Sequence, residues 1–499
     1  MMEKIAKKFI LFNILLLVVS NSAFCQKITA SFPEKFTSKY SDYEILGKNA
    51  FGTILHFFNE DINHQLVIYN ETLKPITKAS VNLQDRNSKL EDILIFPDNI
   101  VLFYAQLIDG INYLKVKKLN NNLDITINPI VLDSVKRDGI EPTQPYYIKA
   151  SPDNSQILCF NLQGSKSERL KINYVIYNNQ FQLLKKSTLI FENNNGVDLK
   201  ASRIANNGNA VFLIAHNSRR PIDDKYAIEN FNLVTINHLD YKATTRVIES
   251  KDLLFKLPAL DISVDGNKIF MSSCYQNIND PKILGLMNGM FSFNPEIEGF
   301  VSKIPLTEVD ISQFKSFEFR NWWEKASIIR PKNIIPRSDG GFILVNESEY
   351  RYTKVVRSPT SNSFNTYPYY NQDQYIRYYD QNHYYDIIAY SIDPNGKVDW
   401  KTNLSKVQET ESDGGIFSSY LLYESNNMLK FLFNEDIYNN GNFMEYNLNA
   451  NGNFKRISLL NSEKKELQLI PQKGKQIDEN TIIIPSERKK YLQLVMIKY

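Results

Sequence analysis

A short turn of Asp or Asn, followed by an aliphatic strand, recurs eight times along the chain. Asp, Asn and Gly tolerate the positive φ angles of tight hairpins. A repeat of 49 to 87 residues is typical of small sheet units that bury their faces only by stacking on neighbours. The chain is therefore predicted to be a repeated all-β structure. The turns begin at Asn49, Asp98, Asp153, Asn206, Asp265, Asp339, Asn426 and Asp478.

The residues after these turns are rich in β-branched and aromatic side chains, which favour strands. The strands expected there are Ile100–Tyr104, Gln156–Phe160, Ala210–Ile214, Lys268–Met271, Phe342–Val345, Leu429–Phe433 and Thr481–Ile484. A second marker, a large apolar residue before Asn or Asp, runs in phase and closes a second hairpin at Asn70, Asn120, Asn178, Asn237, Asn294, Asp393 and Asn449. Two hairpins per repeat make four antiparallel strands, and radial repetition of such sheets predicts a β-propeller.

The last repeat lacks its fourth strand, because Tyr491–Tyr499 indicates a third strand with nothing after it. The segment Lys27–Phe32 alternates polar and apolar residues and precedes the first repeat. We expect it to supply the missing strand, so that the two ends of the chain close the ring and leave no open sheet edge. The prediction is an eight-bladed propeller. Seven blades are the alternative, if the unit from Asp478 onward is an appendage.

Residues 1–25 have the pattern of a secretory signal peptide: Lys4, Lys7 and Lys8, then an apolar stretch over 9–20, then small residues up to Cys25. That stretch is shorter than the roughly 20 residues of a membrane span, and no transmembrane span is expected later. Cys25 is alternatively a lipid anchor, which the bulky Phe24 before it disfavours. Residues 26–499 are predicted to form one propeller domain, exported to the periplasm, the cell envelope or the extracellular space.

Composition argues against several classes of partner and chemistry. The net charge of +3 is too small to indicate binding to nucleic acid. The five histidines show no paired ligand spacing, so neither a metal site nor a cofactor is expected. Cys159 and Cys274 lie in non-adjacent repeats and are predicted to be two buried thiols. No nucleophile elbow and no phosphate-binding loop occurs, so no catalytic residue is assigned.

Repeats four to six carry the extra length of the chain, in connections that share one face of a propeller. Long loops on a rigid scaffold are where binding usually resides. The largest insertion, at about 346–385, belongs to a stretch with eleven tyrosines between Tyr350 and Tyr390. Tyr, Trp and Arg are enriched in binding hot spots. The candidate binding residues are Arg219, Arg220, Trp322, Trp323, Tyr352, Tyr369, Tyr370, Tyr378 and Tyr379. The alternative is a pair of flaps that pack on each other, with these aromatic rings as their private core.

Two groups of residues carry a family resemblance. Ser151–Leu158 and Ser263–Phe270 resemble the Ser-Pro-Asp-Gly repeat of WD40-like bacterial propellers. Asp339–Leu344, followed by Asp386–Trp400, resembles repeats in secreted proteins of Bacteroidota bacteria. The resemblance implies the propeller fold and export. It implies no activity, because this fold hosts many functions.

Two functions are weighed. The favoured one is an exported, non-catalytic binding or scaffold protein of the periplasm or cell envelope, which engages a protein or a glycan through the loop-rich face of blades four to six. The alternative is an exported hydrolase or lyase with carboxylates at the mouth of the central channel. A hydrolase requires converging carboxylates with perturbed ionisation, whereas a binding module requires exposed rings on the loop-rich face.

Overall fold

The computed structural model describes residues 26–499 with short gaps. The gaps are 36–39, 60–62, 82, 84–86, 127, 137–144, 165–168, 193–195, 219–226, 281, 308–327, 359–374, 426 and 438–440, and side chains at 328, 354–358 and 375–378 are also outside the description. The predicted signal peptide and the anchor residue Cys25 therefore lie outside the described residues.

The described residues form 34 strands and one 3-10 turn, η2 (Pro471–Lys473). The strands assemble into four-stranded antiparallel units, numbered here in chain order. Unit one contains β3 (Asp42–Asn49), β4 (Gly52–Asn59), β5 (Asn63–Tyr69) and β6 (Pro75–Ser80); unit two contains β7 (Ser88–Phe96), β8 (Asn99–Ile108), β9 (Ile111–Leu119) and β10 (Ile130–Lys136); unit three contains β11 (Tyr146–Ala150), β12 (Gln156–Gln163), β13 (Arg169–Asn178) and β14 (Leu183–Glu192).

The next two units share one sheet, because β17 also pairs with β19 through Ile228 and Phe255. Unit four contains β15 (Val197–Ile204), β16 (Ala210–Asn217), β17 (Ile228–Ile236) and β18 (Ala243–Glu249); unit five contains β19 (Leu253–Ile262), β20 (Lys268–Asn277), β21 (Ile283–Ser292) and β22 (Phe300–Pro305). Unit six contains β23 (Ile328–Pro336), β24 (Phe342–Ser358), β25 (Tyr375–Ile392), β26 (Val398–Leu404) and the short β27 (Gln408–Glu411); unit seven contains β28 (Leu421–Ser425), β29 (Met428–Asn434), β30 (Asn442–Asn449) and β31 (Phe454–Asn461).

The two ends of the chain meet in unit eight. Its strands are β32 (Lys475–Asp478), β33 (Thr481–Arg488) and β34 (Tyr491–Lys498), together with β1 (Lys27–Ala30) and β2 (Glu34–Lys35). β1 pairs antiparallel with β34, with Lys27 opposite Lys498. The predicted pairing of the first mature segment with the strand that ends at Tyr499 is thus confirmed over Lys27–Ala30. The strands predicted after the repeat turns are confirmed as well.

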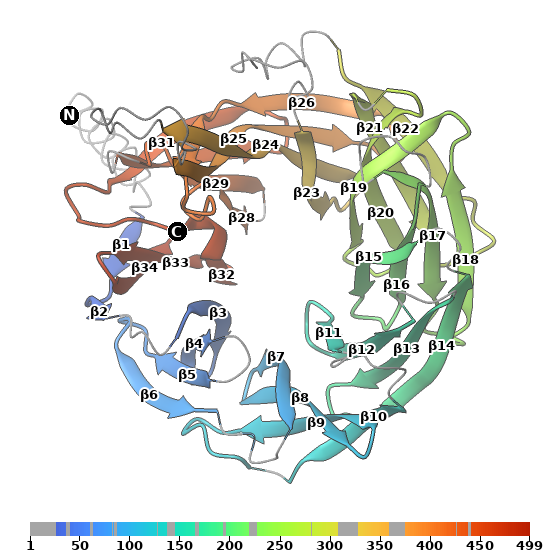
Figure 1. Cartoon of the computed structure of the whole chain (residues 1–499), viewed down its shortest axis with the longest axis horizontal. Helices are drawn as coiled ribbons and strands as arrows, with labels where there is room; N and C mark the ends of the chain where they lie inside the picture. The colour runs from blue at the N-terminus through green and yellow to red at the C-terminus, as the bar shows by residue number, and fades with distance from the viewer. Residues whose placement is uncertain are drawn as a thin grey trace, which may run out of the picture.

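The units lie side by side around a common axis, in a β-propeller-like all-β fold (Figure 1). The first strand of each unit is innermost, and the fourth lies at the periphery. Eight clusters of buried apolar side chains make the core, and each joins two neighbouring units. One of them packs Tyr43 and Leu55 of unit one against Ile483 and Leu494 of unit eight. The core therefore lies between the sheets rather than at the axis.

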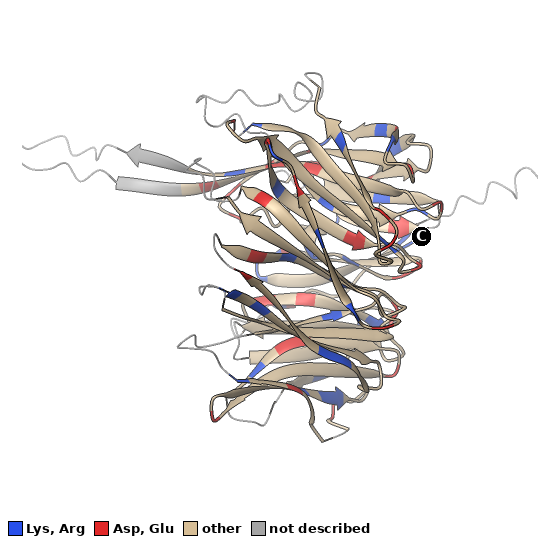
Figure 2. Cartoon of the chain, turned by 90° about the vertical axis from the view of Figure 1, so that its right-hand side faces the viewer, with Lys and Arg blue, Asp and Glu red and all other residues tan. Residues whose placement is uncertain are grey.

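The antiparallel order gives the ring two different faces, which we call the turn face and the loop face. The turns from first to second strand and from third to fourth strand lie on the turn face. The connections from second to third strand and from the fourth strand to the next unit lie on the loop face. Figure 2 views the ring from the side, with its two faces to the left and to the right. Cys159 and Cys274 are both buried and free, as predicted, and burial raises the pKa of the Cys274 thiol to about 12.

The extra length of unit six differs from the prediction, because much of it is strand rather than loop. β24 continues to Ser358 and β25 begins at Tyr375, and they pair along this length with Thr353 opposite Asp380. The reason is the composition of the segment: Tyr, Thr and Val favour strands, and their cross-strand pairs stabilise a two-stranded ribbon. In unit five the extra length is likewise carried by β20 and β21, with only residues 278–282 between them.

Candidate functional sites

The first candidate site is the base of the ribbon formed by β24 and β25 beyond Glu349. β27 pairs with β25 there, with Glu409 opposite His383 and Gln408 opposite Tyr384. The base is therefore a three-stranded sheet. A third strand supplies the backbone partners that an isolated hairpin lacks, so it holds the ribbon in a defined direction.

Four rings form a ladder along one surface of this base. Tyr350 and Tyr352 have ring centroids 5.3 Å apart, and the Tyr352 ring stacks on His383 at 5.6 Å with an interplanar angle of 9°. His383 in turn stacks on Tyr385 at 5.9 Å. Tyr352 is 38% exposed, whereas Tyr385 is buried. The ladder runs from the buried foot of the ribbon out to solvent.

Hydrogen bonds fix the buried end of the ladder. The Tyr385 hydroxyl donates to Glu409 at 2.6 Å and lies 3.0 Å from Nδ1 of His383. Burial and the neighbouring Glu409 carboxylate raise the pKa of Tyr385. Burial also lowers the pKa of His383, against the opposing effect of Glu409. The His383 ring is therefore neutral at pH 7 and acts as an uncharged stacking surface.

The opposite surface of the ribbon base is built into the ring. Tyr384 is fully buried, and the Arg351 guanidinium lies 5.4 Å from its ring centroid and donates a hydrogen bond to its hydroxyl. Gly415 packs so closely that a Cβ there would lie 2.9 Å from the Tyr384 ring. Part of the tyrosine-rich segment is thus buried against the ring, and part of it is exposed. The alternative of two flaps packed on each other involves residues 308–327 and 359–374, which lie outside the described residues.

The structure describes two of the predicted binding residues in full, Tyr352 and the half-buried Tyr379. Tyr378 has a strand backbone opposite Val355, but its side chain is not described. Arg219, Arg220, Trp322, Trp323, Tyr369 and Tyr370 lie outside the described residues. The prediction missed the stacking role of His383, because only the register of β24 against β25 brings its ring to the tyrosines.

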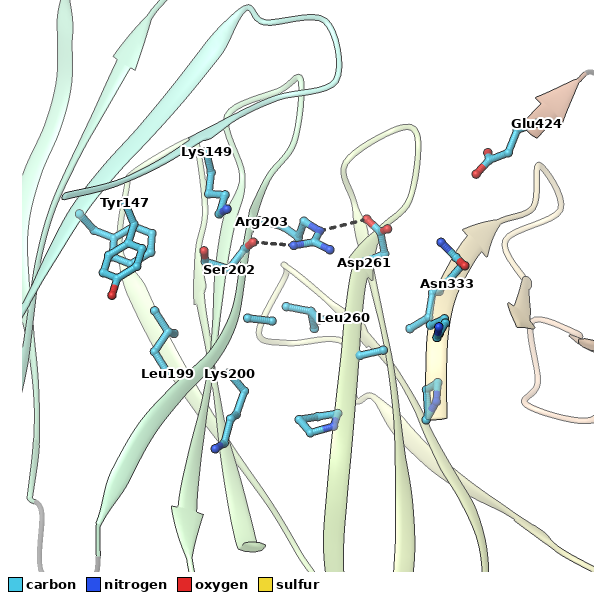
Figure 3. Close-up of a pocket in the computed structure, with 17 residues that line it drawn as sticks. Tyr147, Lys149, Leu199, Lys200, Ser202, Arg203, Leu260, Asp261, Asn333 and Glu424 are labelled. Atoms are coloured by element: carbon cyan, nitrogen blue, oxygen red, sulfur yellow. Dashed lines mark hydrogen bonds and ion pairs between the residues drawn. The ribbon is translucent and has the colours of Figure 1, made fainter. Parts of the chain in front are cut away.

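The second candidate site is a cavity of about 480 Å³ beside the central axis, shown in Figure 3. The innermost strands of units three to seven supply most of its wall. Its lining side chains include Tyr147, Lys149, Phe160, Lys200, Ser202, Arg203, Pro258, Asp261, Pro331, Lys332, Asn333 and Glu424.

Bulges in three neighbouring inner strands shape this cavity. The register shifts between Leu199 and Ala201 in β15, between Lys256 and Ala259 in β19, and between Pro331 and Asn333 in β23. A bulge bends its strand and redirects the extra side chain. The extra residues Lys200, Pro258 and Lys332 all line the cavity.

A flat aromatic platform forms one side of the cavity. Tyr147 of β11 lies opposite Phe160 of β12, and their rings stack at 5.2 Å with an interplanar angle of 17°. Phe160 is buried and meets Phe212 edge-on. Tyr147 is 41% exposed, so one face of its ring is fixed from behind and the other is open.

Charged side chains form the other side, near the turn face. Arg203 and Asp261 make an ion pair at 3.7 Å, longer than a normal hydrogen bond. Figure 3 shows this pair between Lys149 on one side and Glu424 on the other. Within the described residues, neither the Lys149 ammonium nor the Glu424 carboxylate has a hydrogen-bond or ion-pair partner, although the Glu424 backbone is hydrogen-bonded to Gln476.

The carboxylates of the channel wall have perturbed ionisation. Burial raises the pKa of Asp261 against the effect of Arg203, and burial together with Asp261 raises the pKa of Glu424. Across the ring, burial raises the pKa of Asp92 in β7 to about 6. Raised carboxyl pKa values in a concave site are one mark of a functional region.

A buried ionic cluster lies directly behind Lys332. Glu347 is fully buried and pairs with Lys332 and, at 2.8 Å, with the buried Lys406; Ser419 donates to it at 2.6 Å. Burial alone would raise the pKa of Glu347, but the two ammonium groups outweigh burial and lower it. The cluster fixes Lys332 at the cavity wall and joins units six and seven.

In the part of the chain that the structure describes, no group of three or more His, Cys, Asp or Glu side chains is placed to hold a metal ion. The described residues also include no helix with the length and hydrophobicity of a membrane span.

Comparison with known proteins places the chain in no family: no family model matches it, and no curated protein does. Among solved structures, it is similar to a Synechocystis apocarotenoid oxygenase variant, at 11% identity and a TM-score of 0.33, over 92% of this chain and 87% of that one. It is also similar to puromycin hydrolase, at 9% identity and a TM-score of 0.27, over 63% of this chain and 51% of that one. A third match is an ancestral GH74 enzyme, at 11% identity and a TM-score of 0.25, over 87% and 63%. At such scores these matches carry no argument about function.

Proposed function

We propose that the chain is an eight-bladed β-propeller whose ring is closed by β1. Two observations support closure. β1 pairs with β34 as the fourth strand of unit eight. An apolar cluster joins unit eight to unit one, just as similar clusters join all the remaining pairs of neighbouring units. The turns that resemble Ser-Pro-Asp-Gly repeats agree with this architecture. A ring that lacked the β1 contact would leave β34 as an unpaired edge.

We infer that this propeller is an exported, non-catalytic binding or scaffold protein of the periplasm or cell envelope. It engages a protein or a glycan through its loop face at blades four to six. Export follows from the signal-peptide pattern of residues 1–25. The observation that carries the binding function is the ring ladder on the braced ribbon, which ends at the exposed Tyr352.

The ladder suits recognition because its rings are already ordered. Binding costs free energy when side chains lose rotamer freedom, and rings held by stacking have little freedom left to lose. His383 and Tyr385 are fixed by Glu409, and they in turn support Tyr352. Flat aromatic side chains of this kind bury a large area at low entropic cost.

The test is a ribbon excision guided by the register. Because Thr353 lies opposite Asp380, residues 354–379 can be replaced by Asn-Gly, the two-residue turn that suits a hairpin. This keeps Arg351 and the buried Tyr384, whose removal would disturb the core. The wild-type protein and the excision variant are used to capture cross-linked partners from the envelope of the native cell.

We expect a specific partner that the excision loses and that Tyr352→Ser weakens. Tyr491→Ser, which changes a similarly exposed tyrosine (47%) on β34, is the matched control and should keep the partner. Equal melting temperatures of the variants establish that the ring is intact. An identical set of partners for the wild type and the excision variant would rule out the ribbon as the binding surface.

A hydrolase or lyase is the second candidate, and one observation favours it. Asp261 and Glu424 both reach the channel wall with raised pKa values, and a carboxyl group with a raised pKa can serve as a general acid. The test is product release from a panel of polysaccharides by the wild type and by Glu424→Gln. Turnover that disappears in the variant would establish catalysis, and its absence across the panel would leave binding as the function.

A further inference from the structure

We propose that the central cavity is a binding site for a short acidic saccharide, that is, a hydroxyl-rich sugar ring that carries a carboxylate. This inference does not depend on the ribbon, which projects from the loop face. It rests on three features of the cavity wall: the aromatic platform, the cations Lys149 and Arg203, and the Glu424 carboxylate, which makes no side-chain hydrogen bond or ion pair among the described residues.

The platform provides a stacking surface for a sugar ring. Tyr147 lines the cavity and is 41% exposed; its ring stacks on Phe160 at 5.2 Å, and Phe160 in turn contacts Phe212 at 5.3 Å. An aromatic face carries negative charge density and attracts the partly positive C–H bonds of the flat side of a pyranose. Because Phe160 is buried, the platform exists before any ligand arrives.

Among the cations on the wall, Lys149 is the one best placed to contact an anionic ligand. Four of the six charged lining residues are cations, namely Lys149, Lys200, Arg203 and Lys332, against Asp261 and Glu424. Lys332 is neutralised by Glu347 and Glu349, and Lys200 pairs with Asp198 at 3.2 Å. Lys149 makes no hydrogen bond or ion pair among the described residues and acts only at longer range on Asp92, so it is the natural contact for a ligand carboxylate.

The Arg203 guanidinium has further N–H donors that can contact the same ligand. Its pair with Asp261 is loose at 3.7 Å, and one further donor goes to the Ser202 carbonyl at 3.0 Å. A guanidinium carries five N–H donors in a planar fork that matches a carboxylate. Arg203 can therefore accept a second anion without giving up its present contacts.

The carboxylates on the wall explain why the ligand is a sugar rather than a simple anion. Asp261 and Glu424 accept hydrogen bonds from hydroxyl groups, which a sugar acid offers and a small dicarboxylate lacks. Asn333, whose Oδ1 is taken by Tyr420 at 2.9 Å, adds amide donors on the same side (Figure 3). A volume of about 480 Å³ lies within the usual range for small-molecule sites, roughly 300–1,000 Å³.

Isothermal titration with the full mature protein tests this proposal. The probes are di- and trigalacturonic acid, with cellobiose as the neutral control. We expect the acidic sugars to bind, and to bind at least about tenfold more tightly than cellobiose, which corresponds to one well-made charge contact. Affinity for the acidic sugars should fall as ionic strength rises.

Two variants place the ligand in the cavity. Tyr147→Ala and Lys149→Met should each weaken binding about tenfold, the usual loss at a hot-spot residue. Both side chains are exposed, so the variants should fold, and equal melting temperatures check this. Tyr491→Ala and Lys251→Met, which alter exposed residues away from the cavity, are the matched controls and should change nothing.

The outcomes separate this inference from the ribbon function. Saccharide binding that survives the ribbon excision supports a separate cavity site. Cleavage of the sugar during titration would support the site and overturn the non-catalytic function. If neither acidic probe binds, or if the cavity variants bind as well as the wild type, the proposal is wrong.

Discussion

The turn face and the loop face of the ring are built by different means. On the turn face, the turn from third to fourth strand begins with an Asn or Asp in each of units one to seven, and its side chain accepts a hydrogen bond from the backbone N–H two residues later. These residues are Asn70, Asn120, Asn178, Asn237, Asn294, Asp393 and Asn449. Five of the seven also accept the N–H four residues later. Each turn is thus completed by its own residues, almost independently of the rest of the chain.

Neighbouring turns also contact one another on this face. Asn209 donates to the carbonyl of Gly266 at 2.8 Å, and Asp153 N–H donates to the Asn206 side chain at 3.1 Å. Gly266 has φ +73°, and a Cβ there would lie 2.6 Å from Asn207. Polar groups in the turns from first to second strand therefore also set the spacing between neighbouring units.

The loop face depends instead on contacts between distant residues. Glu347 draws its partners from Lys332, Lys406 and Ser419, on three separate segments, and the ribbon is held by β27. The turn face therefore carries the same hairpin turns in successive units, whereas the connections on the loop face differ from unit to unit. Both the ribbon and the buried cluster belong to unit six, the most extended of the units.

The largest test of this contrast is Glu347→Gln on the loop-face side. The change removes the carboxylate paired with the buried Lys406 and leaves Lys332 with Glu349 as its paired carboxylate. We expect a loss of about 3–5 kcal/mol in the free energy of unfolding, as for other broken buried pairs. Urea denaturation measures it, with Glu435→Gln as the control, because its pair with Arg456 is solvent-exposed and worth under about 1 kcal/mol. Equal losses in the two variants would contradict the buried cluster.

A turn-face residue should have a smaller, local effect. Asn449 accepts the N–H groups of Asn451 and Asn453, both at 3.0 Å. Asn449→Ala should cost about 1–2 kcal/mol, because two backbone donors lose their protein acceptor. Asn451→Ala is the neighbouring control, and its cost should be within about 0.5 kcal/mol. The prediction is wrong if the two alanine variants unfold at the same denaturant concentration.

The raised pKa of the channel carboxylate Asp92 should make the stability of the protein depend on pH. Its pKa is raised from 3.8 to about 6 in the folded protein, so the folded state binds the proton more tightly than the unfolded chain does. Stability of the wild type therefore falls as pH rises from about 4 to 6. Asp92→Asn keeps an acceptor for the N–H of Ile93, which is now bonded at 2.7 Å.

The variant should match the wild type at pH 4 and exceed it at pH 8. The gain should be of the order of 1 kcal/mol, because channel water screens the charge. Thermal melting across this pH range provides the measurement. A constant difference between the two proteins at all pH values would contradict the raised pKa.

The smallest effect on stability is expected at the exposed end of the ladder. Tyr352→Ala removes a side chain that is 38% exposed and should change the free energy of unfolding by no more than about 0.5 kcal/mol. Tyr384→Ala, at the buried foot of the same ribbon, should cost several-fold more, about 3–5 kcal/mol. Similar melting temperatures for the two variants would show that the ribbon base is not part of the core.

Much of the fold could be predicted from local signals. The turn positions, the strands after them and the partner of Lys27–Ala30 all follow from residue types and spacing, because hairpin turns and strand alternation depend on neighbours within a few residues. The ribbon was placed correctly within unit six but was expected to be a loop. Whether Tyr or Thr extends a strand depends on a cross-strand partner, and that partner lies some 30 residues away in the chain, as with Thr353 and Asp380.

The candidate sites, like the fold, combine features that the sequence predicts with features that only the structure shows. By itself, the sequence determined the repeat, the order of strands and the tyrosine-rich segment, since these are properties of short stretches. Only the tertiary structure decided that bulges in β15, β19 and β23 open one cavity, and that Tyr147, Arg203, Asp261 and Glu424 line it together. These residues come from four different units, and packing between sheets, rather than any local pattern, brings them to the same wall.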